Sequence, residues 1–297
     1  MRCPPHQRSR SMDQKLIDLY DGYTHGAMSR RAFFDRLTVL AGGTAAATTL
    51  LSMLESNHAL ADTIAENDPR ITGETVTFKA GDQDLSGYLV KPAADGKFPA
   101  VVVVHQNRGL NPHIKDVARR LAVDGFLTLA VDFLSPIDGT PADEDKAREM
   151  NGTLDPGNVT KWAQGAVAYL HRHPSGNGKV GGVGFCWGGG VIGRLAVAEP
   201  TLDAGVVFYG AQPPAEGVPN IQASLLLHYA GLDERISAGI GTFEDALKEN
   251  GKEYTLFMYE GANHAFTDDT QAARYNKEAA ELAWGRTVEF FRKHLTA

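Results

Sequence analysis

Short apolar runs alternate along this chain with longer stretches in which apolar side chains recur every three or four residues. The alternation begins near residue 75, and the run at 99–105 is apolar at almost every position. A continuous run of this kind is typical of a strand that is buried on both faces of a sheet. Strands that alternate with helices of about 10–15 residues predict a mostly parallel sheet with helices on both faces. We therefore expect one α/β domain at 71–297.

The pattern places the elements of this domain along the chain. The runs at 75–79 and 85–92, joined by Gly81 and Asp82, predict an opening antiparallel pair. Further strands are predicted at 99–105, 126–133, 179–185, 204–209, 224–229 and 254–259. Helices are predicted at 112–123, 158–171, 187–198 and from about 272 to 294.

The strand predicted at 179–185 ends in the sequence Gly-x-Cys-x-Gly, and an apolar helical pattern follows it. A strand, a tight turn and a helix in this order are typical of a nucleophile elbow, here with a thiol where a serine hydroxyl is more usual. Gly184 and Gly188 suit such a turn, because the backbones beside the nucleophile come very close. Cys186 is thus a candidate nucleophile. A buried structural cysteine is the common alternative, and the elbow disfavours it.

Two later strand ends carry the partners that this nucleophile would need. Asp233 follows the strand at 224–229, and His264 follows the strand at 254–259. α/β-hydrolase sites use a nucleophile, an acid and a histidine in this chain order. Singly, Asp233 could be a helix N-cap and His264 a loop histidine. Together with the elbow they predict a catalytic triad.

Four motifs resemble the dienelactone hydrolase family, and the resemblance covers about 71–295. They are Gly-Phe-Cys-Trp-Gly-Gly at 184–189, Gly-Leu-Asp-Glu-Arg-Ile at 231–236, Tyr-Glu-Gly-Ala-Asn-His-Ala-Phe at 259–266 and His-Gln-Asn-Arg-Gly-Leu at 105–110. The resemblance implies an α/β-hydrolase fold with a mostly parallel central sheet. It also implies a triad in which Cys186 is the nucleophile, His264 the base and Asp233 its orienting acid. Members cleave lactones and small esters without a cofactor.

The motif at 105–110 implies part of an oxyanion hole. One donor would be the backbone N–H of Trp187, the residue after the nucleophile, and the other that of Gln106 or Asn107. Family members commonly have a glutamate against the resting thiol at the position of Gln106. Because an amide cannot accept a proton at neutral pH, Gln106→Glu is expected to raise activity there. Arg108 could supply a positive charge to the substrate.

A thioester mechanism limits the substrates. A thiolate leaves a tetrahedral intermediate more easily than an alkoxide, so turnover favours enol or phenol leaving groups over alkyl alcohols and amines. No cluster of His, Cys, Asp and Glu has metal-ligand spacing, so no metal is expected. The resemblance to the family implies that no cofactor is needed. The alternative to an ester or enol-lactone hydrolase is a binding protein that kept the fold without efficient thiol activation.

The N-terminal region has a different composition. Arg30 and Arg31 precede a mildly apolar stretch at 37–54, and His58-Ala59-Leu60-Ala61 has small residues in a cleavage-like pattern. This resembles a twin-arginine export signal at 1–61 with a linker at 62–70. It predicts a transient translocase partner, cleavage after Ala61 and an exported, periplasmic or extracellular enzyme without stable membrane association. An amphipathic helix or a single membrane anchor is the alternative.

Charge and cysteine content narrow the remaining possibilities. The chain has 297 residues and a formal net charge of −7, with no basic patch, so nucleic acid and anionic membranes are disfavoured as partners. Cys3 lies in the predicted leader, which leaves Cys186 as the one cysteine after cleavage and excludes an intrachain disulfide there. Residues 1–11 precede Met12, which could be the true start.

Overall fold

The computed structural model of this chain describes residues 5–55 and 63–296. The predicted cleavage position after Ala61 and the leader cysteine Cys3 lie outside these residues. Within them an eight-stranded sheet has the order β1-β2-β4-β3-β5-β6-β7-β8. Its strands are β1 (Ile71–Ala80), β2 (Gln83–Pro92), β3 (Phe98–Val104), β4 (Leu127–Asp132), β5 (Gly176–Phe185), β6 (Ala204–Phe208), β7 (Ser224–Ala230) and β8 (Tyr254–Tyr259).

The strand pairing confirms the predicted mostly parallel sheet. β1 pairs with β2, and β2 with β4, in antiparallel fashion. All pairs from β4 through β3, β5, β6 and β7 to β8 are parallel. The carboxyl ends of the parallel strands therefore meet at one edge of the sheet, and this is where α/β folds place their ligands.

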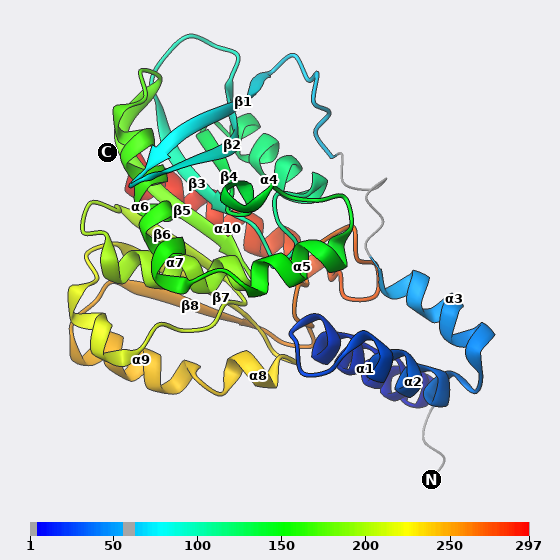
Figure 1. The fold of residues 1–297 in the computed structure, drawn as a ribbon. Coiled ribbons are helices and arrows are strands. Elements are labelled where there is room, and N and C mark those ends of the chain that lie inside the picture. Colours follow the sequence, from blue (N-terminus) through cyan, green and yellow to red (C-terminus); the bar gives the residue numbers. More distant parts are fainter. Residues whose placement is uncertain (1–4, 56–62, 297) are drawn as a thin grey trace.

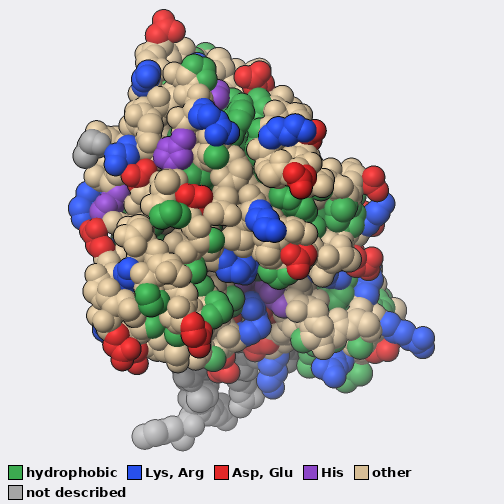
Figure 2. Space-filling view, turned by 60° about the vertical axis from the view of Figure 1, so that its left-hand side comes forward, with side chains coloured by type: hydrophobic (Ala, Val, Ile, Leu, Met, Phe, Trp, Pro, Cys, Tyr) green, Lys and Arg blue, Asp and Glu red, His purple; other side chains and the backbone are tan. Residues whose placement is uncertain are grey.

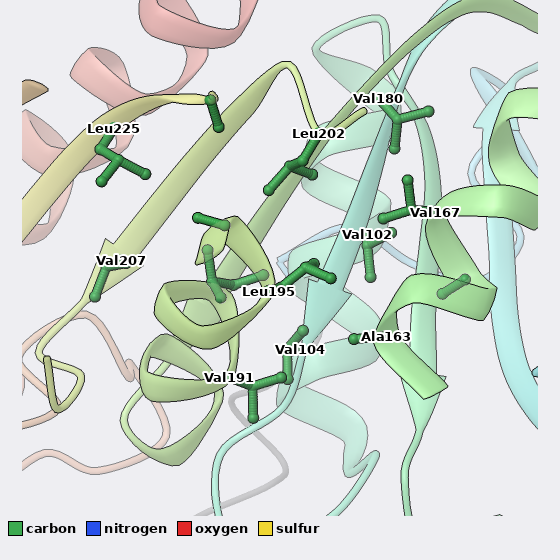
Figure 3. Packing of buried hydrophobic residues seen from close by; sticks show 14 of the residues in the cluster. Val102, Val104, Ala163, Val167, Val180, Val191, Leu195, Leu202, Val207 and Leu225 are labelled. Atoms are coloured by element: carbon green, nitrogen blue, oxygen red, sulfur yellow. The ribbon is translucent and has the colours of Figure 1, made fainter. Parts of the chain in front are cut away.

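Helices cover both faces of the sheet (Figure 1). The domain contains α4 (Pro112–Val123), η2 (Ser135–Ile137), α5 (Glu144–Gly152), α6 (Pro156–Arg172), α7 (Trp187–Ala198), η3 (Ala215–Asn220), α8 (Glu234–Ser237), α9 (Ile240–Glu249) and α10 (Lys277–Leu295). The helices α6, α7 and α9 pack on one face, and Figure 3 shows side chains of α6 and α7 against the central strands. The helices α4 and α10 pack on the other face.

The two covered faces explain the run of valines in β3. Val102 and Val104 point into the first hydrophobic cluster, and Val101 and Val103 point into the second. Successive side chains of a strand alternate between its faces, so both sets must be apolar when both faces are buried. The interpretation of 99–105 as a doubly buried strand is confirmed.

The last predicted helix starts later than its pattern indicated. The helix α10 begins at Lys277, and the Asn276 side chain caps it by accepting a hydrogen bond from Ala279 N at 3.1 Å. The preceding residues form turns around Asp268, whose carboxylate accepts hydrogen bonds from the backbone and hydroxyl of Thr270. The expected start near residue 272 is wrong because these local side-chain bonds compete with helix formation.

Three helices precede the sheet: α1 (Pro5–Thr24), α2 (Arg30–Ala41) and α3 (Thr44–Leu54). They share a small hydrophobic core formed by Leu16, Tyr20, Tyr23, Phe33, Leu37, Ala47 and Leu54. Figure 1 shows α1 and α2 close to α5, on one side of the sheet. Within the described residues no single helix has the length and hydropathy to cross a membrane, whereas α2 and α3 pass that test only as a pair bent by 112°.

The residues that resemble an export signal also contact the α/β domain. Arg30, the first of the twin arginines, opens α2 and pairs with the Asp145 carboxylate. The linker predicted at 62–70 lies against α4, where Ile64 N donates to Asp116 Oδ1 at 2.8 Å. On the face shown in Figure 2, basic and acidic side chains are interspersed. The export signal stays a prediction.

Candidate active site

Cys186 lies between the end of β5 and the start of α7, in a strained backbone conformation. Its φ of 56° and ψ of −116° fall where residues other than glycine are rarely found. A Cβ at Gly184 would collide with the Gly188 carbonyl, and one at Gly188 would collide with the His105 carbonyl. The two glycines therefore permit the close approach that the predicted elbow requires. The turn presents the Cys186 side chain, only 8% exposed, at the N-terminus of α7.

Asp233 and His264 meet at the same edge of the sheet. Asp233 follows β7, and His264 follows β8, as the sequence indicated. His264 Nδ1 lies 2.5 Å from Asp233 Oδ2, and Asp233 Oδ1 accepts a hydrogen bond from Ile236 N at 3.2 Å. Both side chains are buried. Asp233 thus orients the imidazole and compensates a positive charge on it.

The other ring nitrogen of His264 is available for chemistry. Among the described residues, Nε2 of His264 is buried and has no hydrogen-bond partner. Cys186 Sγ and a ring nitrogen of His264 lie within 4.8 Å of each other. Nucleophile and base are thus close enough to form the hydrogen bond that catalytic pairs often tighten only when substrate is bound.

The charges of this group stabilise a thiolate. Burial alone would raise the pKa of Cys186, but nearby His264 and His25 outweigh it and hold that pKa well below the usual thiol range. Burial opposes a charge on His264, yet the Cys186 sulfur and the hydrogen bond to Asp233 raise the pKa of its imidazole. The same bond lowers the pKa of Asp233 against the effect of burial. The arrangement favours a thiolate flanked by imidazolium.

Sequence reasoning missed His25, which it assigned to the leader. His25 Nε2 lies 3.3 Å from Cys186 Sγ, and the His25 and His264 rings meet edge to face with centroids 4.7 Å apart. His25 comes directly after α1, about 160 residues before the nucleophile. Its spacing along the chain carries no signal of this contact, because only the packing of α1 on the domain creates it.

The predicted oxyanion donors flank the thiol. Trp187 is the first residue of α7, where backbone N–H groups have no acceptor within the helix. Asn107 lines the same cavity as Cys186 and Trp187. The Asn107 side chain donates to the Thr24 carbonyl at 2.8 Å, which fixes this loop against the end of α1.

Gln106 and Arg108 have other partners than the sequence suggested. Gln106 Nε2 donates to Asp268 Oδ2 at 3.2 Å, whereas the hydrogen bond to the thiol comes from His25. Arg108 forms an ion pair with Glu144 at 2.8 Å and donates to the Tyr20 hydroxyl at 2.8 Å. Both side chains are buried, and both line a small cavity together with Cys186 and His264. The contacts of Gln106 with the thiol and of Arg108 with substrate stay predictions.

A cavity of about 790 Å³ opens beside the thiol. This size is within the range of small-molecule sites. Its walls come from the nucleophile turn, from α5, from the His264 loop and from the end of α1 and the start of α2. Arg194 also lines it, and in the described part of the chain Nε of Arg194 has no hydrogen-bond partner. Burial lowers the pKa of Arg194.

Among residues 5–55 and 63–296, two groups of side chains could hold a metal ion, although the sequence showed no ligand spacing. One comprises His25, Cys186 and His264, and the other His113, Asp268 and Asp269. Both are assembled from distant parts of the chain, so spacing could not show them. A sulfur with two imidazoles suits a soft divalent ion, and such an ion would occupy the nucleophile itself.

Comparison with known proteins settles the family. The model of the Dienelactone hydrolase family matches residues 85–295, most of this chain. The "Probable 2-oxo-3-(5-oxofuran-2-ylidene)propanoate lactonase" of Bradyrhizobium sp is 34% identical over 222 residues, covering 70% of this chain and 89% of that protein. The chain belongs to the Dienelactone hydrolase family. The resemblance seen in its motifs is thereby confirmed.

One further relative and one solved structure are similar to this chain. The "Putative hydrolase fragment YghX" of Escherichia coli (strain K12) is 50% identical over 115 residues, or 38% of this chain and 98% of that protein. The crystal structure of a dienelactone hydrolase from Anabaena variabilis has 25% identity and a TM-score of 0.60, covering 76% of this chain and 99% of that one. This chain is therefore a hydrolase with an α/β-hydrolase fold.

The N-terminal helices lie outside the Dienelactone hydrolase match. A second family model, described as YqhI-like, matches residues 4–42. This range contains α1 and α2, together with His25. In this family member the α/β-hydrolase domain thus carries an N-terminal addition with a family pattern of its own, and the addition reaches the nucleophile.

Proposed function

We propose that this protein hydrolyses small esters or enol lactones through Cys186, His264 and Asp233, without a cofactor. The observation that carries the proposal is the strained elbow that places Cys186 Sγ within 4.8 Å of a ring nitrogen of His264, whose other nitrogen bonds Asp233. Membership of the Dienelactone hydrolase family supports it. So does the Bradyrhizobium relative, which is named as a probable lactonase.

The first half-reaction forms a thioester. The Cys186 thiolate attacks the carbonyl carbon, and the carbonyl electron pair becomes an oxyanion that the backbone N–H groups of Trp187 and Asn107 stabilise. Collapse of this intermediate breaks the bond to the leaving oxygen. That oxygen takes a proton from the His264 imidazolium and departs as an alcohol or enol.

The second half-reaction restores the enzyme. Neutral His264 takes a proton from water, and the resulting hydroxide adds to the thioester carbon. Collapse expels the Cys186 thiolate and leaves a carboxylic acid, which loses its proton to solvent. Asp233 stays ionised throughout and compensates each imidazolium that forms.

The experiment compares leaving groups and nucleophile variants. p-Nitrophenyl esters should turn over with a burst of p-nitrophenol, and enol lactones should also turn over, whereas the matched ethyl esters should not. Cys186→Ala should lower kcat/KM by about a thousandfold or more, and intact mass spectrometry of the wild type should trap an acyl adduct on Cys186. Activity should persist in EDTA. Equal rates on aryl and ethyl esters, or full activity of Cys186→Ala, would contradict the mechanism. Complete absence of turnover would favour the binding protein.

A further inference from the structure

The Cys186 thiol is flanked by a second histidine that has its own acidic partner. His25 Nε2 lies 3.3 Å from Cys186 Sγ. On its other side, His25 Nδ1 lies 2.8 Å from the Asp21 carbonyl and 3.3 Å from the Asp21 carboxylate. The arrangement repeats that of His264 and Asp233 from the opposite end of the chain.

Several contacts hold Asp21 and His25 against the domain. The Asp21 carboxylate pairs with Arg274 at 3.1 Å and lies 3.9 Å from Arg235. The carbonyl of Thr24, next to His25, accepts a hydrogen bond from Asn107 at 2.8 Å. Three side chains from three separate parts of the domain therefore fix the end of α1 beside the elbow. These contacts fix the position of the His25 imidazole beside the thiol.

The surroundings of His25 favour its charged form. It follows the C-terminus of α1, a helix of 20 residues whose macrodipole attracts positive charge. Burial opposes the charge, but the Cys186 sulfur and the hydrogen bond to Asp21 raise the pKa of His25 to about 10. The groups that face it are Asp21, Cys186 and the His264 ring, with Arg274 behind Asp21.

His25 also fills the role that Gln106 leaves empty. A buried thiolate needs a nearby opposite charge, and the Gln106 amide donates to Asp268. The end of α1 does not close the site, because the 790 Å³ cavity beside Cys186 is lined by both His25 and the α/β domain. The N-terminal segment is therefore a wall of the cavity.

We propose that His25 is a second catalytic histidine, whose imidazolium holds Cys186 as the attacking thiolate while His264 carries out the proton transfers. The inference rests on the proposed function, in which Cys186 is the nucleophile. His25 keeps its proton throughout the cycle. His264 gives one proton to the leaving oxygen and regains one from the hydrolytic water, so the enzyme returns to its starting state.

The test measures the thiol itself. A Cys3→Ser background leaves Cys186 as the one cysteine, and its alkylation by iodoacetamide is followed from pH 4 to pH 10. His25→Gln should move the midpoint of this profile upward by about one pH unit or more, since a facing charge shifts a pKa by about that much. His173→Gln is the matched control, because His173 lies at the amino end of β5, opposite to Cys186.

Kinetics and a second variant complete the test. His25→Gln should slow the burst of p-nitrophenol from p-nitrophenyl esters near neutral pH, because the burst reports attack by the thiolate. The burst should regain part of its rate at high pH, where the thiol ionises unaided. Asp21→Asn should move the thiol midpoint in the same direction by less. Thermal unfolding of each variant shows whether it is folded. A folded His25→Gln with an unchanged alkylation profile, or with a burst rate at or above wild type, overturns the inference.

The two proposals fail in different ways. If Cys186→Ala keeps its activity, the proposed function fails whatever His25→Gln does. If Cys186→Ala is inactive and His25→Gln alkylates like wild type, only the role of His25 fails. A His25→Gln variant that changes only the substrate concentration at which the burst rate saturates, with the maximal burst rate unchanged, shows that His25 shapes the cavity without acting on the thiol. This result also overturns the inference.

Discussion

Gln106 is buried, and its amide nitrogen points at a buried carboxylate. Asp268 Oδ2 accepts from Gln106 at 3.2 Å and from Gln271 at 2.5 Å. Nearby His113 and the hydroxyl of Thr270 keep the pKa of Asp268 low against the effect of burial. An ionised glutamate at position 106 would have no hydrogen to donate to the Asp268 carboxylate. The two buried negative charges would also repel each other. Position 106 is therefore suited to an amide.

This contact reverses the prediction made for Gln106→Glu from the sequence. We expect the variant to lose about 1–3 kcal/mol of unfolding free energy at pH 7, the usual cost of an unsatisfied buried polar group, with no gain in activity. Beside Asp268 the new carboxyl has a pKa raised above its unfolded value. The loss should therefore be small near pH 4, where the carboxyl is protonated, and grow as the pH rises through that pKa.

Denaturant unfolding at several pH values checks this expectation. Gln83→Glu is the matched control, since Gln83 is exposed at the start of β2. A Gln106→Glu variant that is as stable as wild type at pH 7 and more active there would restore the interpretation drawn from the sequence.

Arg194 is the charge in the cavity that has no visible hydrogen-bond partner at its Nε within the described residues. Arg30, Arg148 and Arg235 line the same cavity, and each lies within 4 Å of an aspartate. A half-buried guanidinium without a partner is stabilised by an anionic ligand. We therefore expect Arg194, rather than Arg108, to contact a carboxylate on the substrate.

Arg194→Gln should raise KM for a carboxylate-bearing lactone about tenfold to a hundredfold, which corresponds to the usual worth of a hydrogen bond to a charged group. KM for a neutral p-nitrophenyl ester should change little. Arg172→Gln, at the exposed end of α6, is the control. Equal effects on the charged and the neutral substrate would refute the assignment.

At the level of elements, most of the α/β domain could be predicted from the sequence. A strand that is buried on both faces is apolar at almost every position, and this pattern is visible in the sequence. The helices α4 and α7 begin and end at the predicted residues, and β8 also matches. The order of nucleophile, acid and histidine follows from the same logic, since parallel strands bring their carboxyl ends together. The side chains of Asp233 and His264 lie where the sequence indicated.

The N-terminal helices could not be read in the same way. Phe33 and Leu37 are buried, and the ring of Phe33 stacks on Tyr23 at 4.6 Å. Export signals have the same pattern of weakly apolar helices. The sequence alone therefore does not distinguish an export signal from helices that pack on the domain. Several of their contacts with the domain are polar: the Tyr23 hydroxyl donates to Asp145 at 2.7 Å, and Arg148 lies over the Tyr23 ring. Hydrophobic periodicity cannot reveal an interface of this kind.

In the whole molecule, the fate of residues 1–61 decides what the active enzyme contains. Export through the twin-arginine translocase stays a proposal that rests on Arg30, Arg31 and the apolar stretch after them. Cleavage after Ala61 would remove α1 together with Asp21 and His25. Cleaved export and a catalytic His25 therefore exclude one another in a single molecule, which makes the N-terminus of the active protein an informative measurement.

We expect the active protein to keep its N-terminal helices. The chain would be expressed with its own N-terminus and a C-terminal tag, the cells fractionated, and each fraction assayed on a p-nitrophenyl ester and weighed by intact mass spectrometry. The active fraction should have the mass of a chain that starts at Met1 or Met12, which also identifies the start. Replacement of Arg31 by lysine, with Arg30 and its pair to Asp145 left in place, controls for export. If the specific activity is highest for a chain that starts at Asp62, the mature site works with His264 alone and His25 is dispensable.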